Sequence, residues 1–334
     1  MPDSKQKMPT ETAGFPVARV SAGDCDIGPL KGCVVAIGNF DGVHRGHRAV
    51  IGAALARARA LGRKAAALTF APHPRAFFRP QDPLFLLSRE HEKLRLLAGA
   101  GLDGAIVMRF DAALASTPAQ VFVERILVAG MGIGGAVIGF DFHFGQNRAG
   151  SPQYLTEQGA RLGFAVDVVP PLEDEGRPIS SGGIRQALAA GKVVEAAELL
   201  GAPWFVSGDV IHGEKRGREL GFPTANVRLD PACGLKHGIY AVRARVGSQI
   251  VDGVASFGRR PMFDDGAPLL EVFLFDFAGD LYGRTLDIAF IGWIRREQKF
   301  DSIDALKRQM DADVAQARAV LSRTASAFPV LGTL

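Results

Sequence analysis

Gly38-Asn39-Phe40-Asp41-Gly42-Val43-His44-Arg45-Gly46-His47 follows a short apolar run, 33–37, and precedes a segment with helical periodicity, 50–61. The spaced glycines let the backbone turn sharply and approach a ligand closely. This order predicts a strand, a turn and a helix, with His44 and His47 at the helix N-terminus. Free N–H groups, the helix dipole and two imidazoles favour a phosphate there. The alternative is a histidine pair that only caps the helix.

The segment from about 34 to 200 alternates short apolar runs with helical segments, which predicts a doubly wound parallel sheet of the α/β class. Ligands of such sheets bind beyond the carboxyl ends of the strands. Four loops fall at that edge, and one of them contains the two histidines. The expected strands are 34–37, 65–70, 105–109, 136–140 and 164–169.

The other three loops supply further candidates. His73 lies between two prolines, a pattern that fits a ligand contact or a rigid turn equally well. Asp141 and His143 lie in an aromatic run flanked by glycines, and we expect both to be buried in a ligand-binding wall; the alternative is that the run is plain core. Ser180, Ser181 and Arg185 surround a helix start, where hydroxyls and a guanidinium can hold a leaving pyrophosphate. The alternative for these three is an ordinary N-cap and a solvated arginine.

The pattern changes after Gly201-Ala202-Pro203 to short strands and turns, which predicts a small antiparallel β-barrel. An apolar stripe over 303–321 predicts a C-terminal helix that packs on this barrel. The expected strands are 205–211, 238–246, 250–257, 269–275 and 285–291. We divide the chain into a loose tail, a first domain and a second domain, at 1–30, 31–200 and 201–325.

A second glycine-rich stretch, 208–226, is too charged to be core. Its glycines can wrap phosphates with backbone N–H groups, while Thr224 and Asn226 offer oxygen ligands suited to Mg²⁺. The alternative is a β-hairpin with a charged tip.

Both stretches resemble signatures of one family. Residues 38–47 resemble the nucleotidylyltransferase motif in the longer form of the bacterial bifunctional riboflavin kinase/FMN adenylyltransferases, also called FAD synthetases. Residues 208–226 are similar to the riboflavin kinase signature G-x-V-x-x-G-x-x-x-G-R-x-L-G-F-P-T-A-N, and Leu270-Glu271-Val272 is similar to the L-E-V strand of that family. The resemblance extends from about residue 31 to 321.

The resemblance implies two reactions on small-molecule substrates, riboflavin, FMN and ATP. The first domain would transfer AMP from ATP to FMN, giving FAD and pyrophosphate, and the barrel would phosphorylate riboflavin with ATP and Mg²⁺. The catalytic residues that it implies are His44, His47, Arg185 and Glu271. Contacts to ATP or its phosphates are implied for Gly38, Phe40, Asp41, Gly46, Ser180, Ser181, Gly208, Gly213, Gly217 and Thr224. Flavin contacts are implied for His73, Asp141, Phe142, Arg295 and Glu297, and magnesium ligands for Thr224 and Asn226.

The chain departs from the family pattern at two places. Gly182 replaces the threonine of I-S-S-T-x-I-R, which removes one hydroxyl from the first site. Ser256 and Met262 replace an asparagine and a threonine of the kinase loop. The alternatives are therefore a riboflavin kinase with a weakened or lost adenylyltransferase, or a flavin-binding regulator without turnover.

Composition limits the remaining possibilities. The 334 residues are 47% hydrophobic, enough for two ordinary domains. Basic residues number 39 against 35 acidic ones, a net charge of only +4, so nucleic-acid binding is not implied. Three scattered cysteines suggest neither disulfides nor structural zinc, and no apolar run approaches the roughly twenty residues of a membrane helix. We expect a cytoplasmic protein without a membrane partner; homo-oligomerisation is left open.

Overall fold

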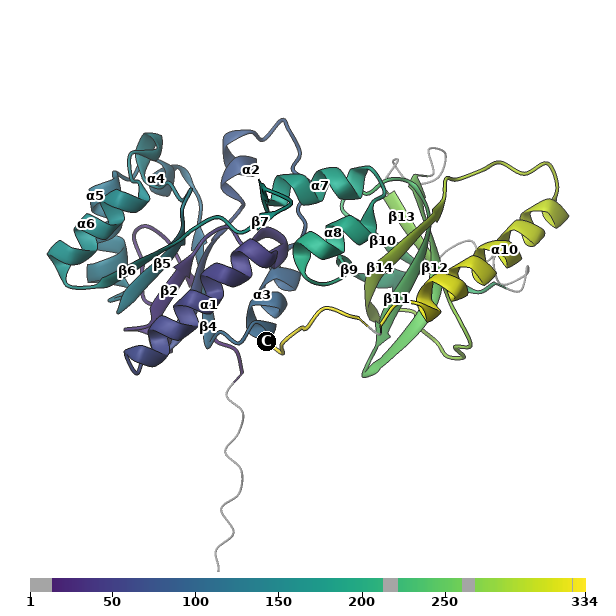
Figure 1. Ribbon diagram of the computed structural model, residues 1–334, viewed down its shortest axis with the longest axis horizontal. Coiled ribbons are helices and arrows are strands. Elements are labelled where there is room, and N and C mark those ends of the chain that lie inside the picture. The colour runs from purple at the N-terminus through teal and green to yellow at the C-terminus, as the bar shows by residue number, and fades with distance from the viewer. Residues whose placement is uncertain (1–13, 213–221, 260–267, 326) are drawn as a thin grey trace, which may run out of the picture.

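The computed structural model describes residues 14–212, 222–259, 268–325 and 327–334. Its first half is built on a parallel sheet with strand order β1-β4-β3-β2-β5-β6 (Figure 1). The predicted doubly wound sheet is confirmed. The strands are β1 (Val17–Val20), β2 (Val34–Ile37), β3 (Ala65–Ala71), β4 (Gly104–Arg109), β5 (Gly135–Gly139) and β6 (Ala165–Val169).

Helices cover both faces of this sheet because its strands alternate between two cores. On β2, Val34 and Ala36 pack with α1 and α3, whereas Val35 and Ile37 pack with the helical segment 119–130 and with α6. The helices are α1 (Arg45–Ala60), α2 (Pro74–Phe78), α3 (Glu90–Gly99), α4 (Ala112–Ala115), α5 (Ala119–Val121) with its π-helical continuation Phe122–Gly130, α6 (Pro152–Leu162), α7 (Ser181–Ala189) and α8 (Val193–Leu200).

The second half forms a closed antiparallel barrel, as predicted, with strand order β10-β13-β12-β11-β14-β9. Helix α10 (Ile303–Ser322) packs across β11, β12 and β14 (Figure 1). The strands are β9 (Phe205–Ile211), β10 (Thr224–Arg228), β11 (Gly238–Val246), β12 (Gln249–Arg259), β13 (Pro268–Leu274) and β14 (Thr285–Arg295).

Four strands of the described residues were not expected from the sequence: β1, β10 and the short antiparallel pair β7 (Glu173–Asp174) and β8 (Arg177–Pro178). Residues 1–30 were predicted to be a loose tail, but Val17–Val20 pairs in parallel with β4 and forms the edge strand β1. That part of the prediction is wrong because four residues show too little periodicity, and pairing with an existing sheet decides their conformation. Strand β10 begins at the end of the glycine-rich stretch 208–226, where turn signals obscured it.

The domains pack on each other through apolar and polar contacts. One hydrophobic cluster continues from α1 and α3 into the barrel through Phe205. Arg95 of α3 makes a two-pronged ion pair with Asp287 of β14, both distances being 2.7 Å. The C-terminal segment then returns to α3, where Gly332 N donates to the Arg95 carbonyl oxygen at 2.9 Å (Figure 1).

Candidate functional sites

The histidine pair lies at the start of α1, as predicted. His44 is the N-cap, and its Nδ1 accepts a hydrogen bond from the His47 backbone N–H at 3.3 Å. The two rings stack with centroids 3.6 Å apart. A Cβ atom on Gly46 would lie 3.2 Å from the His44 ring, so the missing side chain leaves room for that ring. Because Nδ1 accepts, a neutral His44 carries its proton on Nε2 and can donate it to a phosphate oxygen.

Both histidines are neutral at physiological pH. Burial, together with the nearby Arg185 charge, lowers the pKa of His44 to about 4. Burial also lowers the pKa of His47 well below its ordinary value, and His44 and Lys93 lower it further. Phe40 is buried with its ring edge-on to His47, 5.3 Å between centroids. The pair therefore offers hydrogen bonds rather than full charges to an anion.

Asp41 connects the histidine turn to the distant serine and arginine loop. Its Oδ2 accepts from Arg185 Nη2 at 2.5 Å, its Oδ1 accepts from Ser88 N at 3.0 Å, and its carbonyl oxygen accepts from Ser181 Oγ at 3.1 Å. Arg185 also donates to the Phe85 carbonyl oxygen. Arg185 is therefore not a solvated helix residue. Asp41 was predicted to contact phosphates; the structure uses its buried carboxylate to hold Arg185.

The remaining residues of this loop stand at the start of α7. Ser180 is the N-cap, and its Oγ accepts from Gly183 N at 3.2 Å. A Cβ atom on Gly182 would meet only the Ser180 hydroxyl, at 3.7 Å, so a larger residue fits there. At Gly38 a Cβ would lie 3.3 Å from the Phe40 ring, which leaves less room. The helix N-terminus, its serines and Arg185 thus face the same strand edge as α1.

Sequence reasoning missed Lys93, which is buried on α3 beside this site. Its Nζ donates to the Asn39 carbonyl oxygen at 3.0 Å and to Thr69 Oγ1 at 3.3 Å. Asn39 belongs to the histidine motif, so the contact is tertiary. One feature of the sequence could have indicated that Lys93 is buried. This lysine lies on the apolar side of a predicted helix, next to Leu94 and near Leu97, which are both buried.

The candidate flavin residues of this domain follow β3 and β5, the strands on either side of β2. His73 caps α2: its Nδ1 accepts from Arg75 N at 3.1 Å, and burial is the main cause that lowers its pKa to about 4. Next to it, Phe77 and Phe78 pack edge-on against Phe110, with Phe78 63% exposed. This aromatic surface was not predicted.

The loop after β5 differs from its prediction. Asp141 and His143 were expected to be buried in a ligand wall, but both are exposed, because the chain turns outward after β5. Phe142 is half-buried and stacks on Phe144, 5.6 Å between centroids. The loop remains at the sheet edge that carries the histidines, open to solvent.

In the barrel, strand pairing brings the candidate kinase residues together. Asn226 of β10 lies directly opposite Glu271 of β13, and Thr224 lies two residues before Asn226 on the same face. Glu271 is also paired with Ser256 of β12. The alternate residues, such as Val272, fill the barrel core. The amide, hydroxyl and carboxylate oxygens on this outer face form a donor set that suits Mg²⁺ bound to ATP phosphates.

Other predicted barrel residues have structural partners. A Cβ on Gly208 would lie 2.4 Å from Val227, so close packing requires glycine there. Arg295 makes a two-pronged ion pair with Asp313 of α10, at 2.7 and 2.6 Å. Glu297 is exposed, and its carboxylate lies over Gly258, on the same face of β12 as Ser256. The predicted residues Gly213 and Gly217, and the departure at Met262, lie outside the described residues.

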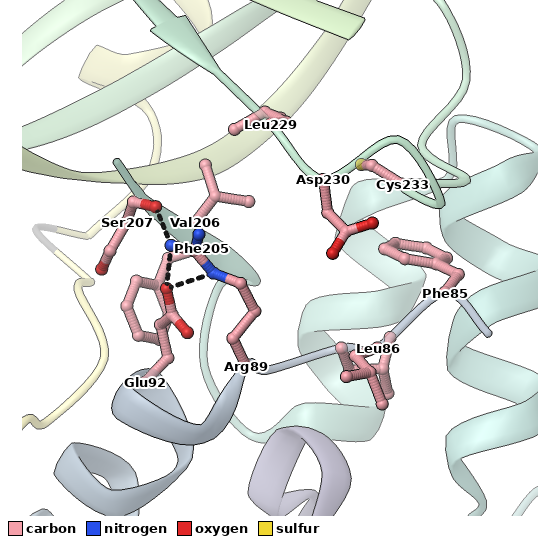
Figure 2. Close-up of a pocket in the computed structure, with 11 residues that line it drawn as sticks. Phe85, Leu86, Arg89, Glu92, Phe205, Val206, Ser207, Leu229, Asp230 and Cys233 are labelled. Atoms are coloured by element: carbon pink, nitrogen blue, oxygen red, sulfur yellow. Dashed lines mark hydrogen bonds and ion pairs between the residues drawn. The ribbon is translucent and has the colours of Figure 1, made fainter. Parts of the chain in front are cut away.

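A pocket lies where the two domains meet. Figure 2 shows Arg89 between Glu92 of α3 and the carbonyl oxygen of Ser207 on β9, and it donates to both. Asp230 of the barrel and Phe85 of the first domain also line the pocket. The second carboxylate oxygen of Glu92 is buried and has no hydrogen-bond partner among the described residues. Apolar side chains make up most of the lining of this pocket between the domains, and Arg89, Glu92, Ser207 and Asp230 are its polar members.

Comparisons with known proteins agree with this arrangement. The FAD synthetase family model matches residues 27–183, and the riboflavin kinase family model matches residues 200–321. A bifunctional riboflavin kinase/FMN adenylyltransferase from Pseudomonas fluorescens is 42% identical over 88% of this chain and 95% of its own length. The protein of that description from Escherichia coli K12 is 40% identical over 87% of this chain and 93% of its own.

A solved structure is similar over nearly the whole chain. It is described as a macrolide-efflux protein from Streptococcus pneumoniae, with a TM-score of 0.82 and 33% sequence identity, and the match covers 93% of this chain and all of that one. Within the described residues, every helix is too short or too polar to cross a membrane.

Proposed function

The chain belongs to the family of bifunctional riboflavin kinase/FMN adenylyltransferases, and we propose that its two sites make FMN from riboflavin and then FAD from FMN, each with ATP. Two family models, one on each domain and in this order, support the assignment. We further propose that Mg²⁺ binds at the barrel site. The observation that carries the proposed function is the Asp41–Arg185 ion pair, which unites the two halves of the nucleotide site.

At the first site, a phosphate oxygen of FMN attacks the α-phosphorus of ATP, and the bond from that phosphorus to pyrophosphate breaks. His44 donates from Nε2 to the charge that develops on the phosphate oxygens, and His47 lies stacked beside it. Arg185, the Ser180 hydroxyl, which accepts from Gly183 N and keeps its own proton to donate, and the N-terminus of α7 hold the leaving pyrophosphate. Direct transfer needs no covalent enzyme intermediate.

At the barrel site, Glu271 accepts the proton of the ribityl hydroxyl as this hydroxyl attacks the γ-phosphorus of ATP. Its position opposite Asn226 supports this role, because one face then carries both the base and the phosphate ligands. Bound Mg²⁺, held by Thr224 and Asn226, would neutralise charge on the ATP phosphates.

The flavin ring at the first site is proposed to lie between the loops after β3 and β5. His73, Asp141 and Phe142 supply polar and aromatic contacts, and the exposed Phe78 adds an apolar surface beside them. In the barrel, Glu297 lies over the same outer face as Glu271 and is the proposed polar contact, while Arg295 is anchored to Asp313 beside it.

The test follows flavins over time by chromatography, with riboflavin, ATP and Mg²⁺ supplied. Wild-type protein should form FMN first and FAD later. His47→Ala should abolish FAD formation and spare FMN, whereas Glu271→Ala should abolish FMN formation but still convert supplied FMN to FAD. His91→Ala, which removes an exposed histidine of α3, is the matched control and should change neither product.

Three other results would each contradict part of the proposed function. FMN without FAD from the wild type would leave a riboflavin kinase whose first site is inactive. Flavin binding without either product would favour a regulator. One substitution that removed both activities in a folded protein would contradict two separate sites.

A further inference from the structure

A buried lysine lies beneath the first site and takes no part in the mechanism above. Lys93 is 7% exposed, and its ammonium group bonds to Asn39 in the turn after β2 and to Thr69 near the end of β3. Strands β2 and β3 are parallel neighbours. The ammonium therefore sits at the carboxyl edge of the sheet, between the loops that carry His44 and His73.

The charge of Lys93 lacks a paired anion. Both of its acceptors are neutral oxygens, and no carboxylate of the described residues lies within ion-pair distance. Burial lowers the pKa of Lys93, and the nearby carboxylates Asp41 and Glu90 raise it. The Asp41 carboxylate is already bonded to Arg185 and Ser88, and Glu90 is paired with Arg19. Burying a cation without a paired anion costs folding free energy, so such a group calls for an explanation.

The groups around Lys93 leave its positive charge available to a ligand of the first site. His44, His47 and His73 are neutral, because burial lowers the pKa of each. The Lys93 charge lowers the pKa of both His47 and His73. The ammonium is therefore close to the histidine turn and also to the loop after β3. An ammonium has three N–H donors and two of them have acceptors, so one is left for a phosphate oxygen or a bridging water.

We infer that Lys93 supplies an uncompensated positive charge to the nucleotide phosphates at the first site, and that bound ATP or pyrophosphate balances it. The inference rests on the proposed function and adds to Arg185 a second cation at that site. In a site of low dielectric, a preorganised cation of this kind acts strongly on a developing phosphate charge.

The test compares Lys93→Met, which keeps the length of the side chain and removes its charge, with Lys64→Met at an exposed lysine. FAD formation is measured with FMN and ATP supplied and riboflavin absent. We expect Lys93→Met to raise the KM for ATP about tenfold, the size of one charge-assisted hydrogen bond. FMN formation by the barrel should stay within about twofold, and the urea midpoint without ligand should not fall.

A second measurement does not depend on turnover. Inorganic pyrophosphate should raise the melting temperature of the wild type and of Lys64→Met, and Lys93→Met should lose most of that rise. An unchanged KM and an unchanged pyrophosphate effect would overturn the inference. So would loss of both activities with a lower urea midpoint, since that marks a purely structural lysine. A wild type that makes no FAD would overturn the proposed function instead, and the pyrophosphate effect would then decide the role of Lys93.

Discussion

The two sites are held together in different ways. At the first site, Asp41, Ser88 and Arg185 come from three distant segments and meet through side-chain hydrogen bonds. At the barrel site, Asn226 and Glu271 meet because adjacent strands pair in one register. The first arrangement depends on tertiary packing, whereas the second is set by backbone pairing within one barrel. The first site should therefore be the more sensitive to changes outside it.

The segment 84–89 explains how such changes would reach the first site. Ser88 bonds to Asp41, while the adjacent Arg89 and Leu87 bond to the barrel: Arg89 donates to the Ser207 carbonyl oxygen, and Trp204 Nε1 donates to the Leu87 carbonyl oxygen at 2.8 Å. One short segment thus supports the adenylyltransferase site on one side and β9 on the other.

Among the substitutions that leave the reacting histidines in place, Asp41→Asn should cause the largest difference between the two activities. The amide cannot neutralise Arg185, and removing one partner of a buried pair costs about 3–5 kcal/mol. If about 3 kcal/mol of this cost raises the activation free energy of adenylyl transfer, the rate of FAD formation falls by about 100-fold. FMN formation should be unchanged. Initial rates of both products, measured on one preparation, check this.

The control for Asp41 is Asp174→Asn, which breaks the half-exposed pair with Arg45 at 2.8 Å. Pairs of that exposure contribute about 0–1 kcal/mol, so both activities should stay near wild type. Equal losses of FAD and FMN formation in Asp41→Asn would remove the contrast between the sites.

Arg95→Met tests whether the interface between the domains supports the first site. At the interface Asp287 is buried and Arg95 is half-buried, so an Asp287 without its arginine should cost about 3 kcal/mol of the free energy of unfolding. Urea unfolding measures this, and FAD formation should fall before FMN formation as urea rises. The control is Arg318→Met, whose exposed pair with Asp276 should contribute less than about 1 kcal/mol. An unfolding midpoint equal to that of the wild type would show that the Arg95–Asp287 ion pair does not stabilise the contact between the domains.

The sequence predicts the strands and helices that carry strong periodicity, together with the histidine turn and the barrel. It does not predict β1, whose four residues become a strand only by pairing with β4. The candidate site divides in the same way, because local motifs predict its residues and tertiary packing decides which of them meet. His44 and Arg185 were found from local motifs, but the bond between Asp41 and Arg185 is a product of tertiary packing.

Lys93 was missed for a related reason. A single lysine in a helix ordinarily reaches solvent, and only the packing of α3 against the turn 41–43 and β4 turns this one inward. Burial of Asp141 was wrongly expected because an aromatic run predicts core, whereas the chain turns outward after β5.

His44 should make the stability of the first domain depend on pH. Its pKa in the folded state is about 4, below its ordinary value of 6.5, so the unfolded chain binds the proton more tightly. The stabilising contribution is therefore complete above about pH 6.5 and is lost as the pH falls toward 4. His44→Asn keeps an N-cap but does not titrate. The difference in unfolding free energy between the two proteins should change over this interval; a constant difference would mean that His44 has an ordinary pKa.

The smallest expected effect comes from Gly182→Thr, which restores the hydroxyl of the family motif at a position with room for it. One additional hydrogen bond to a phosphate contributes about 1 kcal/mol, which corresponds to a KM for ATP about fivefold lower in FAD formation. Gly182→Ala is the matched control, since it gains helix propensity without a hydroxyl. If only threonine lowers KM, Gly182 faces the phosphates, and the first site gains affinity without any change in the barrel. If both variants act alike, the effect comes from the stability of α7, and the hydroxyls of Ser180 and Ser181 are sufficient for the anion.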